Sequence, residues 1–332
     1  MHALPKVEIL FLRKEEVESL LNLEDAVLAA EQAFMVLGEG QLVQDHSILP
    51  IKGPNIIATL PTFLRSLNLY GVKQVSVYEK REPDDKLPSV WGSLIILNQP
   101  SNGLPYAIMD GTAITNMRSG GGHAVVAAKY LARRDSKTLG VIGCGAQGHI
   151  GLRSFAKAFS LEYIKIYDVN PEAQSTLLEK LREEITAKIT AVNSAEEAVR
   201  DSELILVATT SREPVVFEPW VGKGSFTAGL MGFRDIDPKL GARAEKLVLG
   251  SHETDGPVVV DGAGGLPTPM GVSKEDVYAD MGEIVTGVKA GRENGQERII
   301  YTHIGMGAHD VILAHKAYIK AKKEGTGTKI YL

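Results

Sequence analysis

Residues 138–148 read TLGVIGCGAQG, and this stretch decides the fold. Its first five residues form a short apolar run typical of a buried strand, and a helical pattern follows the last glycine. Gly143, Gly145 and Gly148 have the spacing G-x-G-x-x-G between these two elements. In that context Gly143 makes a tight turn, Gly145 lets the backbone approach a pyrophosphate, and Gly148 lets the helix pack on the strand. The stretch therefore predicts a dinucleotide-binding unit.

A carboxylate stands where such a unit needs one. The next strand, YIKIYD, ends at Asp168, about 20 residues beyond the glycines, where it can accept hydrogen bonds from ribose hydroxyls. The following residues, VNPEA (169–173), contain no Arg or Lys to receive a 2′-phosphate, and the carboxylate would repel one. The pattern favours NAD over NADP.

The hydrophobic pattern differs between the two halves of the chain. From Thr138 onward, apolar strands alternate with amphipathic helices, which is typical of a parallel sheet. Residues 48–109 instead form short strands separated by turn-forming and charged segments, and this indicates an antiparallel or mixed sheet. A helical segment, AHDVILAHKAYIKAKK (308–323), follows the last strand and can return to the first sheet.

We therefore predict an α/β protein with a Rossmann-type parallel-sheet domain and a smaller α+β domain. The predicted boundaries are 119–303 for the Rossmann-type domain, and 1–118 with 304–332 for the smaller one. The glycine- and proline-rich segment 261–271 is predicted to be a long surface loop.

Composition limits the classes of partner. The net charge of −5 provides no broad basic field, which argues against nucleic acid and favours small molecules. A single cysteine rules out an internal disulfide framework, and no run of about 18 apolar residues predicts a membrane span. The charged N-terminal stretch does not resemble a secretory signal, so a cytoplasmic location is expected.

Two cations lie in structured surroundings. Lys73 falls within the apolar strand YGVKQVSV, where an ammonium is costly unless it meets an anion. Arg118 stands before a run of three glycines that let a ligand approach the backbone. A substrate carboxylate would satisfy both residues. The residues alone leave a second interpretation open, in which each cation is exposed or paired for structural reasons.

Several blocks of the chain together resemble the ornithine cyclodeaminase and mu-crystallin family, which includes alanine dehydrogenases and ketimine reductases. The resemblance runs nearly end to end, and its clearest blocks are GVKQVSVYE (71–79), residues 100–132, TLGVIGCGAQG, ADMGEIVTGVKAGR (279–292) and GMGAHD (305–310). It implies a Rossmann domain for NAD(P), a second domain that also forms a dimer, and an amino acid or imine substrate. It further implies that Lys73 and Arg118 match the family's carboxylate-binding and catalytic lysine and arginine.

The chain departs from the family pattern at two places. His46, in DHSILP, stands at or near the position of another substrate-binding arginine. An imidazole cannot form the same two-pronged bond and titrates near neutrality, so it would suit a different polar group and leaves room for a dicarboxylic substrate. The simpler interpretation is that His46 caps a strand or faces solvent. Gly232 stands where an acid is usual, and Asp235 either compensates or matches a structural acid one turn on.

The sequence thus predicts an NAD(H)-dependent imine reductase or L-amino acid dehydrogenase, with Lys73 and His46 both open as the proton-transferring group. A redox-neutral cyclodeaminase and a non-catalytic NAD-binding protein are the alternatives. The predicted catalytic residues are Lys73, Arg118, His46 and Asp235, and no metal is expected. The predicted cofactor-binding residues are Gly143, Gly145, Ala146, Gln147, Gly148, Asp168, Asn170, Thr209, Thr112 and Met231.

Overall fold

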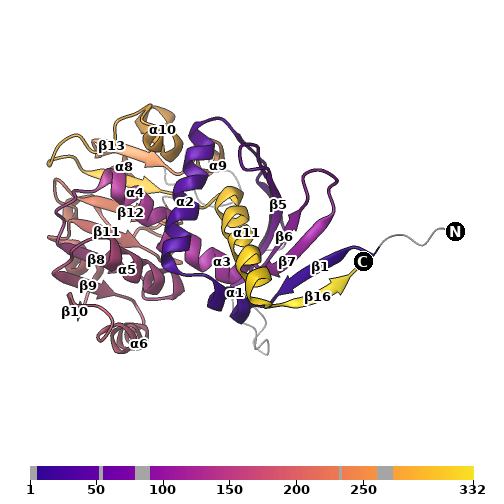
Figure 1. Cartoon of the computed structure of the whole chain (residues 1–332). Coiled ribbons are helices and arrows are strands. Elements are labelled where there is room, and N and C mark those ends of the chain that lie inside the picture. The colour runs from indigo at the N-terminus through magenta and orange to yellow at the C-terminus, as the bar shows by residue number, and fades with distance from the viewer. Residues whose placement is uncertain (1–5, 52–54, 79–89, 232–233, 260–271) are drawn as a thin grey trace. The chain divides into compact units, whose positions relative to one another are not determined.

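The computed structural model describes residues 6–51, 55–78, 90–231, 234–259 and 272–332 (Figure 1). The chain divides into two compact units. Unit 1 contains Met1–Ala29, Glu39–Arg118 and Met306–Leu332, and unit 2 contains Ala30–Gly38 and Ser119–Gly305. The predicted loop at 261–271 and the position of Gly232 lie outside the described residues.

Unit 2 is built on an eight-stranded sheet in the order β10-β9-β8-β11-β12-β15-β13-β14. Every pairing in this sheet is parallel, which confirms the predicted Rossmann-type fold. Its strands are β8 (Thr138–Ile142), β9 (Tyr163–Tyr167), β10 (Lys188–Ala191), β11 (Leu204–Val207), β12 (Phe226–Gly229), β13 (Lys246–Leu249), β14 (Val277–Asp280) and β15 (Ile299–Thr302).

The central strands of this sheet are buried on both faces. All four residues of β11, β12, β13 and β15 are buried, because parallel sheets are covered by helices on each side. The sequences LILV and IIYT therefore read as continuous apolar runs rather than as alternating patterns. Most of the α-helices of this unit follow the strands: α4 (Ala124–Leu131), α5 (Ala146–Ala158), α6 (Pro171–Leu181), α7 (Ala195–Val199), α8 (Pro238–Arg243), α9 (His252–Val259) and α10 (Met281–Val285).

Unit 1 contains a second eight-stranded sheet, in the order β16-β1-β7-β6-β5-β4-β2, with β3 paired to β4. The pair β1–β7 is parallel and the other pairs are antiparallel, so the sheet is mixed. Its strands are β1 (Glu8–Leu12), β2 (Leu42–Gln44), β3 (Ser47–Pro50), β4 (Ile56–Leu64), β5 (Leu69–Tyr78), β6 (Val90–Asn98), β7 (Pro105–Asp110) and β16 (Thr328–Tyr331).

One face of the unit 1 sheet is covered by helix α11. Buried residues alternate with half-buried ones along β4, so this strand has one inner and one outer face. The yellow helix α11 lies along β4, β5 and β6 on the inner face (Figure 1). The α-helices α1 (Lys14–Leu20), α2 (Leu23–Gly38), α3 (Gly111–Asn116) and α11 (Gly307–Glu324) belong to this unit, although α2 continues into unit 2.

The remaining short helical segments include one that carries a predicted site residue. A π-helix, η1 (Met117–His123), follows α3 directly and contains the three consecutive glycines. Single turns of 3₁₀-helix occur at Glu218–Trp220 and Lys274–Asp276. Among the described residues, no helix has the length and apolar character needed to span a membrane.

Candidate active site

The glycine-rich loop of unit 2 has the geometry that its sequence predicts. Gly143 has φ +98°, a left-handed conformation, and a Cβ there would lie 2.4 Å from the Ala208 carbonyl oxygen. A Cβ on Gly148 would lie 1.8 Å from the Gly143 carbonyl oxygen, so only glycine lets this helix pack so closely. A Cβ on Gly145 would meet no atom within 4 Å. The fold therefore requires the first and third glycines, whereas the second lies against open space.

The N-terminus of α5 faces this loop without a side-chain cap. Gly145 is the N-cap residue, and it has no side chain to accept the first helical N–H groups. Those N–H groups and the helix dipole give the 13-residue helix a positive end that suits an anion. Ala146 opens the helix, and the side-chain oxygen of Gln147 accepts a hydrogen bond from the Gly120 N–H at 3.2 Å.

Asp168 lies directly after β9 and is held by the loop. Its Oδ2 accepts a hydrogen bond from the Cys144 N–H at 2.7 Å, and its Oδ1 accepts one from the Asn170 N–H at 2.9 Å. The side chain of Asn170 in turn caps α6 by accepting the Glu172 N–H at 3.0 Å. The carboxylate is therefore fixed beside the second glycine of the loop, at the distance in sequence that the motif requires.

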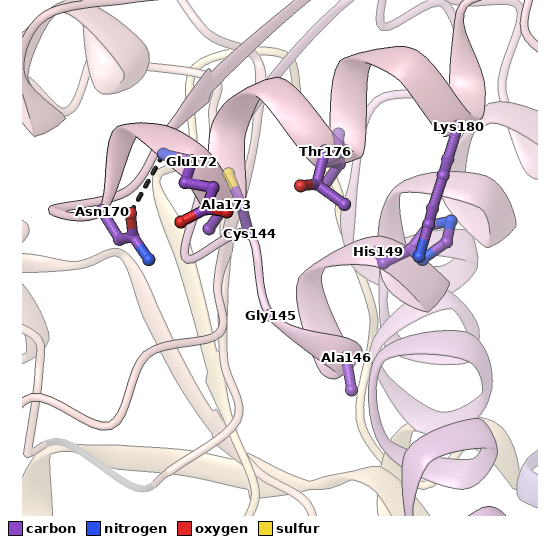
Figure 2. Close-up of a pocket in the computed structure, with 10 residues that line it drawn as sticks. Cys144, Gly145, Ala146, His149, Asn170, Glu172, Ala173, Thr176 and Lys180 are labelled. Carbon is purple, nitrogen blue, oxygen red and sulfur yellow. Dashed lines mark hydrogen bonds between the residues drawn. The ribbon is translucent and has the colours of Figure 1, made fainter.

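A cavity of about 470 Å³ adjoins the loop, and Figure 2 shows its lining. It lies between the first turn of α5 and the length of α6, and its wall includes Cys144, His149, Asn170 and Lys180. Burial, with added repulsion from Arg153 and Lys180, lowers the pKa of His149. Burial and the neighbouring Asp168 raise the pKa of the Cys144 thiol to about 12, so it is uncharged near neutral pH.

Lys73 is buried in the middle of the unit 1 sheet. Its side chain is 2% exposed, and its partners on the neighbouring strands, Leu60 and Ile95, are buried and apolar. The Nζ donates hydrogen bonds to Thr115 Oγ1 at 2.6 Å and to Asp310 Oδ1 at 2.8 Å. Burial lowers the pKa of Lys73 to about 8, although the charge of Asp310 opposes this shift.

Arg118 joins the same cluster from η1. Its Nε lies 3.4 Å from Asp310 Oδ1, the oxygen that also accepts from Lys73, and its side chain is 7% exposed. The hydroxyl of Thr115 donates to the Gly111 carbonyl at 2.6 Å, which fixes its oxygen as an acceptor for Lys73. The structure thus brings together the two cations that the sequence singled out. We call Lys73, Thr115, Arg118 and Asp310 the unit 1 cluster.

Sequence reasoning did not single out Asp310 or Thr115 as site residues. Asp310 ends the block GMGAHD and lies in the first turn of α11, where a carboxylate is favoured by the helix dipole. Its side chain is fully buried. An acid within an apolar helical pattern is the signal that could have identified it, because such a group is seldom buried without a cation.

Asp235 lies in unit 2, after β12, and is also fully buried. The Thr209 hydroxyl donates a hydrogen bond to its Oδ2 at 2.8 Å, so these two predicted site residues are in contact. Burial raises the pKa of Asp235 to about 6, and the bond from Thr209 opposes the shift. Within the same unit, Met231 is half-buried just beyond β12.

The two other predicted residues lie in unit 1. His46 is half-buried on the connection between β2 and β3, and its backbone N–H donates to Asp45 Oδ1 at 2.9 Å. Thr112 is half-buried in the first turn of α3. In the part of the chain that the structure describes, no group of three or more His, Cys, Asp or Glu side chains could hold a metal ion.

The chain is similar to known proteins over nearly its whole length. A relative, alanine dehydrogenase from Archaeoglobus fulgidus, is 33% identical over 333 residues and covers 98% of each chain. The structure of Delta(1)-pyrroline-2-carboxylate reductase from Thermococcus litoralis, in complex with NADH and L-proline, has a TM-score of 0.85 at 32% identity and covers 97% of this chain and 100% of that one. An archaeal alanine dehydrogenase dimer with bound NAD has a TM-score of 0.86 at 30% identity, with coverages of 98% and 99%. The model of the ornithine cyclodeaminase/mu-crystallin family matches residues 7–325, and the chain belongs to that family.

Proposed function

We propose that the chain is an NAD(H)-dependent oxidoreductase that transfers a hydride between nicotinamide and the α-carbon of a small imino or amino acid. The main observation that supports this proposal is the net charge of the unit 1 cluster. Lys73 and Arg118 supply two positive charges and Asp310 one negative charge, so the buried cluster has a net charge of +1. A buried net charge is costly unless an anion pairs with it, and an amino or imino acid offers a carboxylate.

The residues of unit 2 fit the dinucleotide. The uncapped N-terminus of α5 would bind the pyrophosphate, and the open space at Gly145 would let it approach the backbone. Asp168, held by two backbone N–H groups, would accept hydrogen bonds from the ribose hydroxyls. When bound, the nicotinamide ring supplies or accepts the hydride. The relative from Thermococcus litoralis is crystallised with NADH, which supports this choice of cofactor.

The unit 1 cluster would orient the substrate and move a proton. Lys73 and Arg118 would bind the substrate carboxylate through charge-assisted hydrogen bonds, which fix the face of the C=N bond that receives the hydride. Reduction of an imine also consumes a proton. With its pKa near 8, the Lys73 ammonium can give one up near neutral pH far more readily than an exposed lysine. A role for His46, and a second carboxylate on the substrate, stay predictions.

The test is a paired assay of NADH absorbance and ammonia. We expect NADH to be oxidised with Δ1-pyrroline-2-carboxylate, or with pyruvate and ammonia, at a rate that rises with enzyme concentration. Ammonia release from ornithine without net change in NADH would instead establish a cyclodeaminase. Binding of NADH with neither reaction would leave a non-catalytic NAD-binding protein, and the proposal would be wrong.

Asp168 should set the choice between the two dinucleotides. We expect NADH to bind at least about tenfold more tightly than NADPH, which corresponds to about 1.4 kcal/mol, because the carboxylate accepts from ribose hydroxyls and repels a 2′-phosphate. Titration of NADH and NADPH fluorescence measures both dissociation constants. Asp168→Asn removes the negative charge, so the dissociation constants of NADH and NADPH should become more similar. Equal constants for the wild type would contradict the assignment.

We propose that the chain forms a homodimer through the outer face of the unit 1 sheet; the similar archaeal alanine dehydrogenase is a dimer. Val43, Leu49 and Leu94 lie on the side of the sheet opposite Lys73, and their side chains are 43%, 60% and 39% exposed. Pairing of two subunits on this face would cover these exposed apolar side chains. We expect a dimer, or a multiple of dimers, by light scattering at micromolar concentration.

Leu94→Glu would place a charge on this face and should shift the protein toward the monomer. Ile319→Glu is the matched control, since Ile319 is a 51% exposed apolar residue on α11. A monomeric wild type would contradict the proposed dimer. Equal effects of both substitutions would show that the dimer interface does not lie on this face. The cytoplasmic location likewise stays a prediction.

A further inference from the structure

We infer that Asp310 is a positioning residue for the proposed reaction: it holds the Lys73 ammonium and the Arg118 guanidinium on one carboxylate oxygen and keeps Lys73 protonated. The inference rests on the proposed function. It adds to the site a residue that sequence reasoning did not single out.

The geometry places Asp310 between the two cations. Its Oδ1 lies 2.8 Å from Lys73 Nζ and 3.4 Å from Arg118 Nε, and all three side chains are buried. Its Oδ2 is also buried and has no hydrogen-bond partner among the described residues. From the first turn of α11, the carboxylate thus accepts a hydrogen bond from Lys73 on β5 and forms an ion pair with Arg118 on η1.

A purely structural ion pair would be built differently. Buried ion pairs seldom add net stability compared with apolar residues of similar volume, and the sheet neighbours of Lys73 are apolar. A structural pair whose charges are all buried would also be expected to be neutral, because an uncompensated buried charge is costly. Here a second cation, Arg118, gives the four residues of the cluster a net charge of +1, which a bound carboxylate would neutralise. The arrangement is that of a binding site completed by its ligand.

The charge of Asp310 acts on the protonation of Lys73. Among the described residues, the groups that face Lys73 are Asp310 from α11, Arg118 from η1, the Thr115 hydroxyl from α3, and apolar residues of β4 and β6. Burial and Arg118 both lower the pKa of Lys73, and Asp310 raises it. In Asp310→Asn only the lowering effects remain, so Lys73 should lose its proton at a lower pH than in the wild type.

The first test is the pH profile of kcat/KM for reduction of Δ1-pyrroline-2-carboxylate by NADH. The wild type should lose activity as pH rises through the pKa of Lys73, near 8. In Asp310→Asn this alkaline limb should move down by at least about one pH unit, with kcat reduced at least about tenfold and NADH affinity unchanged. An alkaline limb at the wild-type pH in this variant would overturn the inference.

Asp25→Asn is the matched control. Asp25 is also a buried carboxylate of unit 1 that pairs with lysines of α11, Lys316 and Lys320, but it lies outside the cluster. It should keep the wild-type alkaline limb. If Asp310→Asn does not fold, Asp310→Glu is the second variant. It keeps the negative charge but carries the carboxylate on a longer side chain, so kcat should fall while the alkaline limb of the pH profile stays at the wild-type pH. A limb shifted by Asp25→Asn or by Asp310→Glu would count against the inference.

A second readout needs no turnover. Because Lys73 has a pKa near 8 when folded and 10.5 as its ordinary value, the unfolded chain binds more protons between these pH values. The free energy of unfolding should therefore rise with pH across this window on account of Lys73, and the rise should begin at lower pH in Asp310→Asn. Urea unfolding at a series of pH values measures it.

The two readouts separate the inference from the proposed function. If the wild type reduces no imine, the proposed function fails, and urea unfolding still tests the link between Asp310 and Lys73. An identical pH dependence of unfolding in wild type and Asp310→Asn would contradict that link. Adding Lys73→Met to both proteins should abolish the difference between them, since this substitution removes the titrating group.

Discussion

Lys73→Ala and Arg118→Ala should each lower kcat/KM for imine reduction by roughly two to three orders of magnitude. Each substitution removes a buried cation that the substrate carboxylate would meet, and the loss of one partner from such a pair costs about 2–5 kcal/mol. The affinity for NADH should stay nearly unchanged, because both residues belong to unit 1, whereas the glycine-rich loop and Asp168 belong to unit 2. Steady-state kinetics and NADH fluorescence titration measure the two quantities.

Stability must be measured alongside these kinetics. Removing Lys73 leaves the Asp310 carboxylate buried with one cation instead of two, so some loss of stability is expected. Lys316→Ala is a useful control, since Lys316 pairs with a carboxylate of the same unit at a half-exposed position. If Lys73→Ala or Arg118→Ala is folded and retains wild-type turnover, the site has been misplaced.

The sequence predicted the parts of the fold that depend on local patterns. The strand, turn and helix around Gly143 and Gly148 follow from steric rules, because a side chain at either position would meet a backbone oxygen. The parallel sheet follows from apolar runs such as LILV, which alternate with amphipathic helices and are typical of a sheet buried on both faces. Strand β16 was not predicted. Its four residues are all exposed, so it has no burial pattern and depends on pairing with β1 at the other end of the chain.

The parts that were missed depend on contacts between distant residues. Asp310 is 237 residues from Lys73, and no local pattern shows that the two side chains share a hydrogen bond. The second half of α2, Ala30–Gly38, packs with unit 2, although its helical pattern runs on unbroken from unit 1. Periodicity identifies a helix and its apolar face, but it does not identify what that face packs against.

Alanine at two glycines of the loop should have different effects on stability. Gly148→Ala should lower the free energy of unfolding by roughly 1–3 kcal/mol or more, because the new Cβ would lie 1.8 Å from the Gly143 carbonyl oxygen and the backbone must shift. Gly145→Ala meets no atom within 4 Å, so its cost should not exceed about 1 kcal/mol, the difference between glycine and alanine as an N-cap.

Gly145→Ala should nevertheless weaken NADH binding by at least about tenfold, because the added methyl group would occupy the space through which a pyrophosphate approaches the backbone. Urea unfolding and NADH titration of the same protein separate the two effects. Gly295→Ala is the control, since a Cβ there also meets no atom within 4 Å and the residue lies outside the loop. If a stably folded Gly145→Ala protein binds NADH as tightly as the wild type, the pyrophosphate does not bind at this loop, and the proposed cofactor site is wrong.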